Sequence, residues 1–103
     1  MSKFVLVYKG GGMAATEAEQ QAVMAQWMGW FGELGEAMLD GGNPFGASSS
    51  VGSDGSVSAG GPAGLTGYSI VSAETLDAAA SLAKGCPVLS SGGTVEVYEA
   101  LEM

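Results

Sequence analysis

The stretch GYSIVSAETLDAAASLAKGCPVLSSGGTVEVYEAL, residues 67–101, decides the fold because it contains a strand, a helix and another strand in one run. In GYSIVS (67–72), larger and smaller side chains alternate, which predicts a strand with one covered face. Ser72 is the expected N-cap of the following helix and Gly85 its stop. TVEVYEALE (94–102) alternates again and predicts the last strand. The helix between them would bury one side, made of Leu76, Ala79, Ala80 and Ala83.

The first part of the chain shows the same order of strand and helix. KFVLVYK (3–9) is an apolar run of strand length. Thr16 and Glu19 have the spacing of a capping box, and Gly35 suits a C-cap, so we expect a helix ending at about residue 34. Its wide apolar stripe predicts a mostly covered helix and consists of Val23, Met24, Trp27, Met28, Trp30, Phe31 and Leu34. Two interior glycines, Gly29 and Gly32, favour close packing against a sheet or a partner helix.

The middle of the chain is predicted to hold a short strand and a hairpin. EAMLD (36–40) opens the strand, and Asn43-Pro44 ends it. GASSSVG (46–52) and GSVSAG (55–60) flank Asp54-Gly55, which is a hairpin signal between β-compatible runs.

Together these elements predict one α+β domain over residues 1–103, a split β-α-β-β-α-β arrangement. Both helices would lie on one face of a mainly antiparallel sheet. The other face would carry Val and Tyr side chains with nothing in the same chain to cover them. We therefore expect self-association through this face, as a homodimer or a higher assembly.

Composition excludes several classes of partner. Three lysines, no arginine and eleven acidic residues give a net charge of −8, which argues against nucleic acids and anionic membranes. No segment has the length and apolarity of a signal peptide or a membrane span. Without histidine, and with Cys86 as the single cysteine, we expect no metal, no cofactor and no disulfide, and a cytoplasmic location. Cys86 itself is expected to be a small buried apolar residue.

The residues also indicate a family. DGSVSAGGPAGLTGYSIVSAETLDAAASLAKGCPVLSSGGTVEVYEAL (54–101) resembles the second half of YCII-related proteins of the DGPF type, in the dimeric α/β-barrel superfamily. KFVLVYKGG (3–11) looks like their first strand, and the Trp-containing helix ending in Leu34-Gly35 looks like their first helix. The resemblance implies a ferredoxin-like protomer, two of which pack sheet to sheet.

One loop departs from the family pattern. Where the family carries Asp-Gly-Pro-Phe, this chain has Gly60-Gly61-Pro62-Ala63, so the acid and the aromatic residue are missing. Relatives are thought to use a histidine and aspartate pair, and this chain has no histidine. Their chemistry therefore does not transfer, and a catalytic role is disfavoured.

The sequence leaves three functions open. The first is binding of a small apolar or aromatic molecule, without catalysis, between the first helix and the sheet. The second is a cofactor-independent lyase, isomerase or monooxygenase that uses Asp40 or a tyrosine for proton transfer, although turn residues of this kind are more often simply exposed. The third is a protein-interaction module linked to transcription regulation, as the resemblance implies. The candidate pocket residues are Tyr8, Trp27, Phe31, Asn43 and Tyr68, of which the helical ones also suit ordinary core packing.

Overall fold

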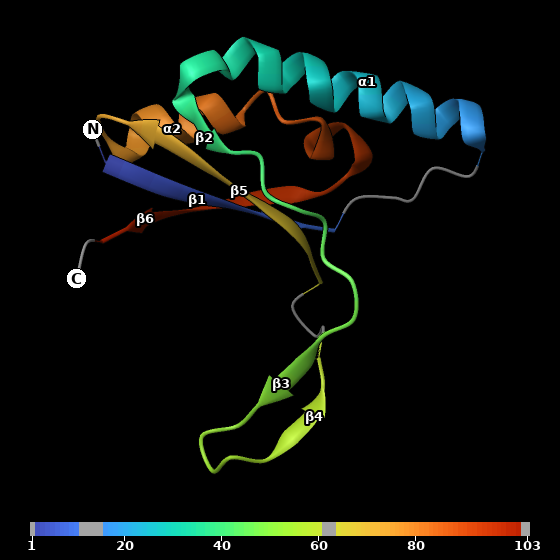
Figure 1. Cartoon of the computed structure of the whole chain (residues 1–103), viewed down its shortest axis with the longest axis vertical. Helices are drawn as coiled ribbons and strands as arrows, with labels where there is room; N and C mark the ends of the chain where they lie inside the picture. Colours follow the sequence, from blue (N-terminus) through green and yellow to red (C-terminus); the bar gives the residue numbers. More distant parts are fainter. Residues whose placement is uncertain (1, 11–15, 61–63, 102–103) are drawn as a thin grey trace.

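A computed structural model describes residues 2–10, 16–60 and 64–101 of the chain (Figure 1). The elements, in order, are β1 (Ser2–Lys9), α1 (Glu17–Leu34), the 3₁₀ helix η1 (Gly35–Ala37), β2 (Met38–Asp40), β3 (Ser49–Val51), β4 (Val57–Ala59), β5 (Leu65–Ala73), α2 (Leu76–Ala83), the 3₁₀ helix η2 (Pro87–Ser91) and β6 (Thr94–Ala100).

Four strands form one antiparallel sheet in the order β2-β5-β1-β6. Both helices lie on the same face of this sheet, as Figure 1 shows. On β1, Phe4, Leu6 and Tyr8 are buried toward the helices, while the residues between them face away. The predicted α+β class and the antiparallel sheet with helices on one side are confirmed.

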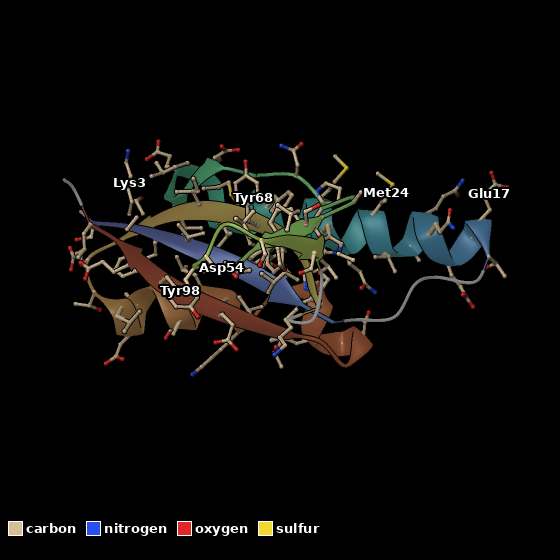
Figure 2. All side chains as sticks on the ribbon, turned by 90° about the horizontal axis from the view of Figure 1, so that it is seen from below. Lys3, Glu17, Met24, Asp54, Tyr68 and Tyr98 are labelled. Carbon is tan, nitrogen blue, oxygen red and sulfur yellow. The ribbon has the colours of Figure 1, made fainter. Side chains whose placement is uncertain are left out.

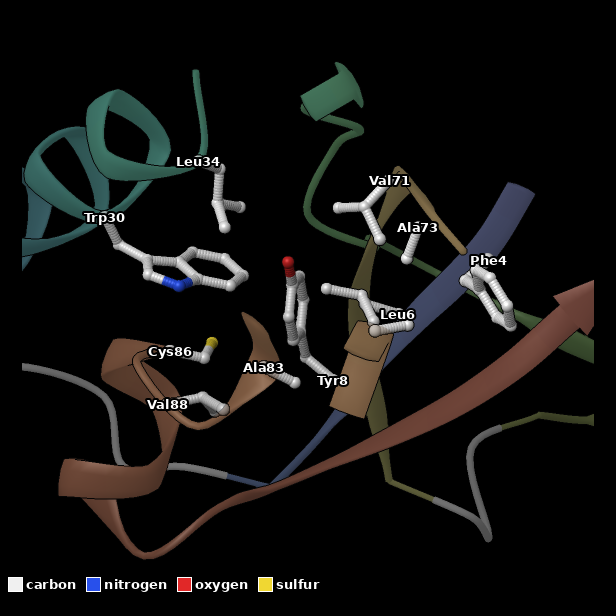
Figure 3. Packing of buried hydrophobic residues seen from close by; sticks show 11 residues of the cluster. Phe4, Leu6, Tyr8, Trp30, Leu34, Val71, Ala73, Ala83, Cys86 and Val88 are labelled. Carbon is white, nitrogen blue, oxygen red and sulfur yellow. The ribbon is translucent and has the colours of Figure 1, made fainter. Parts of the chain in front are cut away.

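The core lies between the sheet and the two helices (Figure 3). Trp30 joins the layers, because its indole N–H donates a hydrogen bond to the Leu82 carbonyl oxygen over 3.1 Å. Gly85 lies directly against this ring: an added Cβ would be 3.0 Å from the indole Cδ1. A glycine at this position lets Trp30 reach α2.

The caps of the helices follow local hydroxyl chemistry. Thr16 Oγ1 accepts a hydrogen bond from the Glu19 N–H over 3.1 Å, which confirms the predicted start of α1. The predicted Ser72 cap of α2 is wrong, because β5 continues to Ala73 and Thr75 Oγ1 accepts from the Ala78 N–H over 3.0 Å. The predicted buried side of α2 is also wrong at Leu76, which is 52% exposed beside the cap.

The prediction that α1 is mostly covered is wrong. Its buried residues are Trp30 and Leu34, both in the last two turns. Figures 1 and 2 show the first turns of α1 extending past the ends of the strands. An added Cβ at Gly29 or Gly32 would have nothing within 4 Å in the described chain outside the helix backbone, so close packing within the chain does not explain these glycines.

The predicted hairpin is present and projects from the rest of the molecule (Figure 1). Strands β3 and β4 pair as Ser49↔Ala59 and Val51↔Val57, and the Asp54 carboxylate accepts a hydrogen bond from the Ser56 N–H over 2.9 Å in the turn. At the base of the hairpin, the Gly60 N–H donates to the Ser48 carbonyl oxygen over 3.1 Å.

The sheet face away from the helices, here named the open face, carries Val5, Val7, Tyr68, Ile70 and Tyr98. Tyr98 is 60% exposed, and Figure 2 looks onto this face. The Phe45 ring stacks on Tyr68 with centroids 5.9 Å apart. Within the ranges described, no helix is long and apolar enough to cross a bilayer.

Candidate ligand-binding cleft

A cleft of about 460 Å³ lies between α1 and the segment 41–44 that follows β2. Tyr8 of β1 and residues 66–68 of β5 complete its lining. The side of the cleft formed by α1 is apolar and consists of Val23, Met24, Trp27, Met28 and Phe31.

All five predicted pocket residues line this cleft. Trp27 and Phe31 come from α1, Tyr8 from β1, Asn43 from the segment after β2, and Tyr68 from β5. The structure therefore brings together residues that lie up to sixty positions apart in the sequence. Tyr68 differs from the other four, because it belongs to the open face of the sheet, where its ring stacks on Phe45.

Aromatic rings in edge-to-face contact make the inner wall rigid. The centroids of Tyr8 and Trp27 are 4.9 Å apart at an interplanar angle of 77°. Trp27 also contacts Phe31 and Trp30, each with centroids 5.8 Å apart. Because Trp30 is buried in the core, this chain of contacts fixes the cleft wall to the core.

A chain of hydrogen bonds joins the strands to segment 41–44. The Tyr8 hydroxyl donates to Ser69 Oγ over 2.6 Å, and the Ser69 hydroxyl donates to the Gly41 carbonyl oxygen over 2.7 Å. Burial raises the pKa of Tyr8 to about 12, so this phenol is neutral at physiological pH. The sequence analysis missed Ser69, whose only signal was a hydroxyl on the covered side of a strand, two residues before Val71.

Segment 41–44 passes so close to β5 that glycine is required. Gly42 has φ +72°, and an added Cβ would overlap the Tyr68 carbonyl oxygen. The two segments are also closely packed at Gly67, since an added Cβ there would be 3.2 Å from the Asn43 carbonyl oxygen. These close approaches hold Asn43 and Pro44 beside β5, where Pro44 forms an isolated antiparallel β-bridge with Gly67.

Asp40, the candidate catalytic acid, is exposed and does not line the cleft. Its carboxylate Oδ1 accepts a hydrogen bond from the Gly42 N–H over 2.8 Å. This is the geometry of an Asx turn, which orients the start of segment 41–44.

Other chemistry-bearing groups are not gathered at the cleft. Over the described ranges, no three His, Cys, Asp or Glu side chains are placed to hold a metal ion. Cys86 is buried in the core, as expected, and burial raises the pKa of its thiol to about 11. The ionisable residues among the lining are the two tyrosines, Tyr8 and Tyr68.

Gly60, where the expected motif would carry an acid, is packed too closely to hold a side chain. A Cβ there would be 2.5 Å from Ser48 Oγ and 2.8 Å from the Ser48 carbonyl carbon. An acid at this position would force the base of the hairpin apart. The rest of the motif, positions 61–63, lies outside the described residues.

Comparisons of the chain with protein-family models, with curated proteins and with solved structures found no match. The resemblance to YCII-related proteins stays a prediction that depends on the motifs quoted above.

Proposed function

We propose that this protein binds a small apolar or aromatic molecule in the cleft between α1 and the sheet, without catalysing a reaction. The observation that carries the proposal is the cleft of about 460 Å³ with an aromatic and aliphatic lining. Ligand sites in proteins are typically concave, of about 300–1,000 Å³, and lined mainly by apolar side chains with a few polar groups.

The same lining argues against catalysis. General acid–base chemistry near neutral pH needs a group that exchanges protons there, and the chain has no histidine. Burial holds Tyr8 in its protonated form, and Asp40 stands outside the lining. A cofactor-independent lyase, isomerase or monooxygenase therefore has less support, and nothing in the cleft favours a role in transcription regulation.

Binding can be tested with naphthalen-1-ylmethanol as the probe, followed by the fluorescence of Trp27 and Trp30. The variant Gly41→Leu is designed to fill the cleft, since an added Cβ would be 3.9 Å from Phe31 Cε2 and has room to form. Gly46→Leu is the matched control, because Gly46 is outside the lining and an added Cβ meets nothing within 4 Å.

We expect saturable binding to the wild type and to Gly41→Leu at least about tenfold weaker binding, with Gly46→Leu unchanged. Equal binding by wild type and Gly41→Leu would place the probe elsewhere and refute the proposal. If a second copy of the chain occupied the cleft instead, apparent probe affinity would fall as the protein concentration rises.

We also propose that two copies pack with their open faces together, as in the dimeric α/β-barrel proteins that the sequence resembles. The support is the row of apolar and aromatic side chains on that face, including Ile70 and Tyr98. Contiguous apolar patches of this kind are uncommon on monomers.

A lone cysteine in a chain without disulfides also supports a reducing, cytoplasmic location.

The dimer can be tested by light scattering of the wild type and of Ile70→Lys at micromolar concentration. Two buried lysines facing each other across a twofold axis would repel, so the variant should be a folded monomer and the wild type a dimer. Val51→Lys, on the exposed hairpin, is the control and should keep the wild-type mass. A monomeric wild type would remove this part of the proposal.

A further inference from the structure

We infer that the cleft selects an uncharged aromatic ligand and rejects anionic and cationic ligands of the same shape. This inference rests on the proposed binding function and adds the chemical class of the ligand. It depends on the charges around the cleft, the state of its aromatic rings and the nature of its polar groups.

An anionic ligand would find no counterion. Among the residues that the structure describes, none of those lining the cleft is an Asp, Glu, Lys or Arg. The three lysines of the chain, Lys3, Lys9 and Lys84, are all outside the lining. The net charge of −8 adds a repulsive field around the whole molecule. A carboxylate or phosphate would lose its hydration in an apolar cleft without compensation.

A cationic ligand is the stronger competitor, because the acidic surface attracts it and aromatic rings can bind cations. The rings of this cleft are already engaged with one another: Tyr8 and Trp27 meet edge to face at 4.9 Å, and Trp27 meets Trp30 at 5.8 Å. The Asp40 carboxylate is outside the lining and accepts its hydrogen bond from Gly42. An ammonium group would therefore be desolvated without a carboxylate beside it, which costs more than a contact with a ring returns.

The tyrosine at the inner end adds no charge. The Tyr8 proton is donated to Ser69, and the Ser69 proton is donated in turn to Gly41. The hydroxyl protons of Tyr8 and Ser69 are therefore both engaged in hydrogen bonds inside the protein, and Tyr8 remains an uncharged residue of the cleft wall.

The remaining groups suit a neutral aromatic molecule with one polar substituent. Met24 and Met28 are 66% and 70% exposed, and both line the cleft. Thioether side chains are adaptable and pack favourably against aromatic rings. Asn43 and Thr66 are exposed members of the lining. The Asn43 amide can donate and accept, and the Thr66 hydroxyl, which donates to the Tyr8 carbonyl oxygen over 3.3 Å, can still accept, so a hydroxyl or amide on the ligand would be accommodated beside them.

The test uses three probes that share one naphthalene ring: naphthalen-1-ylmethanol, 1-naphthoate and 1-naphthylmethylammonium. Their affinities for the wild-type chain are measured by calorimetry at neutral pH, at low and at high salt. We expect the alcohol to bind at least about tenfold more tightly than either ion at both salt concentrations, because the penalty is local desolvation, which salt screens little.

The variant Asn43→Asp provides a gain of function. It places a carboxylate in the lining and should raise the affinity for the ammonium probe by about tenfold. The affinity for 1-naphthoate should fall further, because the two carboxylates repel each other. Gln26→Glu is the charge-matched control, because it adds the same single negative charge at an exposed position outside the lining, and it should leave the order of the three probes unchanged.

The outcomes separate the two proposals. Binding of either ion as tightly as the alcohol would overturn the selectivity while the binding function stands. Failure of all three probes to bind would overturn both. An Asn43→Asp variant that leaves the ammonium affinity unchanged would show that the charge of the lining does not set the selectivity.

Discussion

The two halves of α1 carry the same kind of apolar stripe and have different surroundings. In the second half, residues 27–34, Trp30 and Leu34 are only 4% and 8% exposed and belong to the core. In the first half, residues 17–26, Val23 is partly covered and Met24 is an exposed residue of the cleft lining. The first turns extend beyond the strands in both Figure 1 and Figure 2. Because the apolar stripe of α1 is longer than the sheet beneath it, Val23 and Met24 extend the cleft wall that Trp27, Met28 and Phe31 begin.

The opposite wall of the cleft depends on a short segment rather than on another strand. Segment 41–44 follows β2, is tied to β5 through Ser69, and approaches β5 at Gly42. In the second half of α1, Trp30 and Leu34 therefore stabilise the fold. The binding site is defined by this segment and by the α1 residues that face it, which are Val23, Met24, Trp27, Met28 and Phe31. Substitutions on the core side and on the cleft side should therefore differ in their effects on stability and on binding.

The largest difference is expected between Trp30→Ala and Met24→Ala. Removing Trp30 leaves a cavity in the core and the Leu82 carbonyl oxygen without its indole donor, so we expect a loss of about 3–5 kcal/mol in the free energy of unfolding. Met24→Ala should cost about 0.5 kcal/mol or less, since it alters an exposed side chain. Urea denaturation of both variants measures the comparison. Equal losses would mean that the first half of α1 is covered in solution.

Gly42→Ala tests the segment that closes the cleft. The substitution forces a side chain into φ +72° and against the Tyr68 carbonyl oxygen, so either the fold loses about 2 kcal/mol or the segment moves away from β5. In both cases binding of naphthalen-1-ylmethanol should weaken. Gly46→Ala is the control and should match the wild type in stability and in binding. A Gly42→Ala variant with wild-type values would contradict the close approach.

A smaller effect is expected for Tyr8→Phe, which connects the core and the cleft. Losing the hydroxyl leaves Ser69 with one partner fewer and should cost about 1 kcal/mol at neutral pH.

The pH dependence gives Tyr8→Phe a second readout. The pKa of Tyr8 is raised from 10.0 to about 12, so on raising the pH the unfolded chain releases this proton first. Stability is fully present below the lower value and is lost as the pH rises toward the higher one. The thiol of Cys86 acts in the same direction from 9.0 to about 11. As the pH rises from 9 to 12, the unfolding midpoint should fall less steeply in these variants than in the wild type. The difference should lie at the upper end of the range for Tyr8→Phe and at the lower end for Cys86→Ala. A slope unchanged in both variants would contradict the assignment.

The parts predicted well from the sequence were those set by nearby residues. Thr16 and Glu19 fix the start of α1 within one turn, and Asp54-Gly55 fixes the hairpin, because both depend on local hydrogen bonds. The five pocket residues were found because they sit at strand ends or on the helix stripe, and these positions converge in any sheet with helices on one side.

The predictions that were wrong concern features that depend on where distant elements of the fold end. Ser72 and Thr75 are equally good caps by chemistry, and only the length of β5 chooses between them. Ser69 acquires its role from Tyr8, sixty-one positions away, which no local pattern reveals. The extent of the sheet beneath α1 is likewise a tertiary property, so the sequence could not show that its first half is uncovered.

The smallest expected effect concerns Gly29, an exposed position in the second half of α1. Since an added Cβ meets nothing within 4 Å in the described chain outside the helix backbone, Gly29→Ala should stabilise the protein by up to about 1 kcal/mol through helix propensity alone. Gly85→Ala is the contrasting change. Its Cβ would be 3.0 Å from the Trp30 ring, so this substitution should lower the free energy of unfolding. If Gly29→Ala instead lowered the free energy of unfolding, and more so at higher protein concentration, a second copy would be packing against α1. The exposed side of α1 would then be an interface between two copies of the chain. Its uncovered apolar side chains would contact the second copy instead of a small ligand.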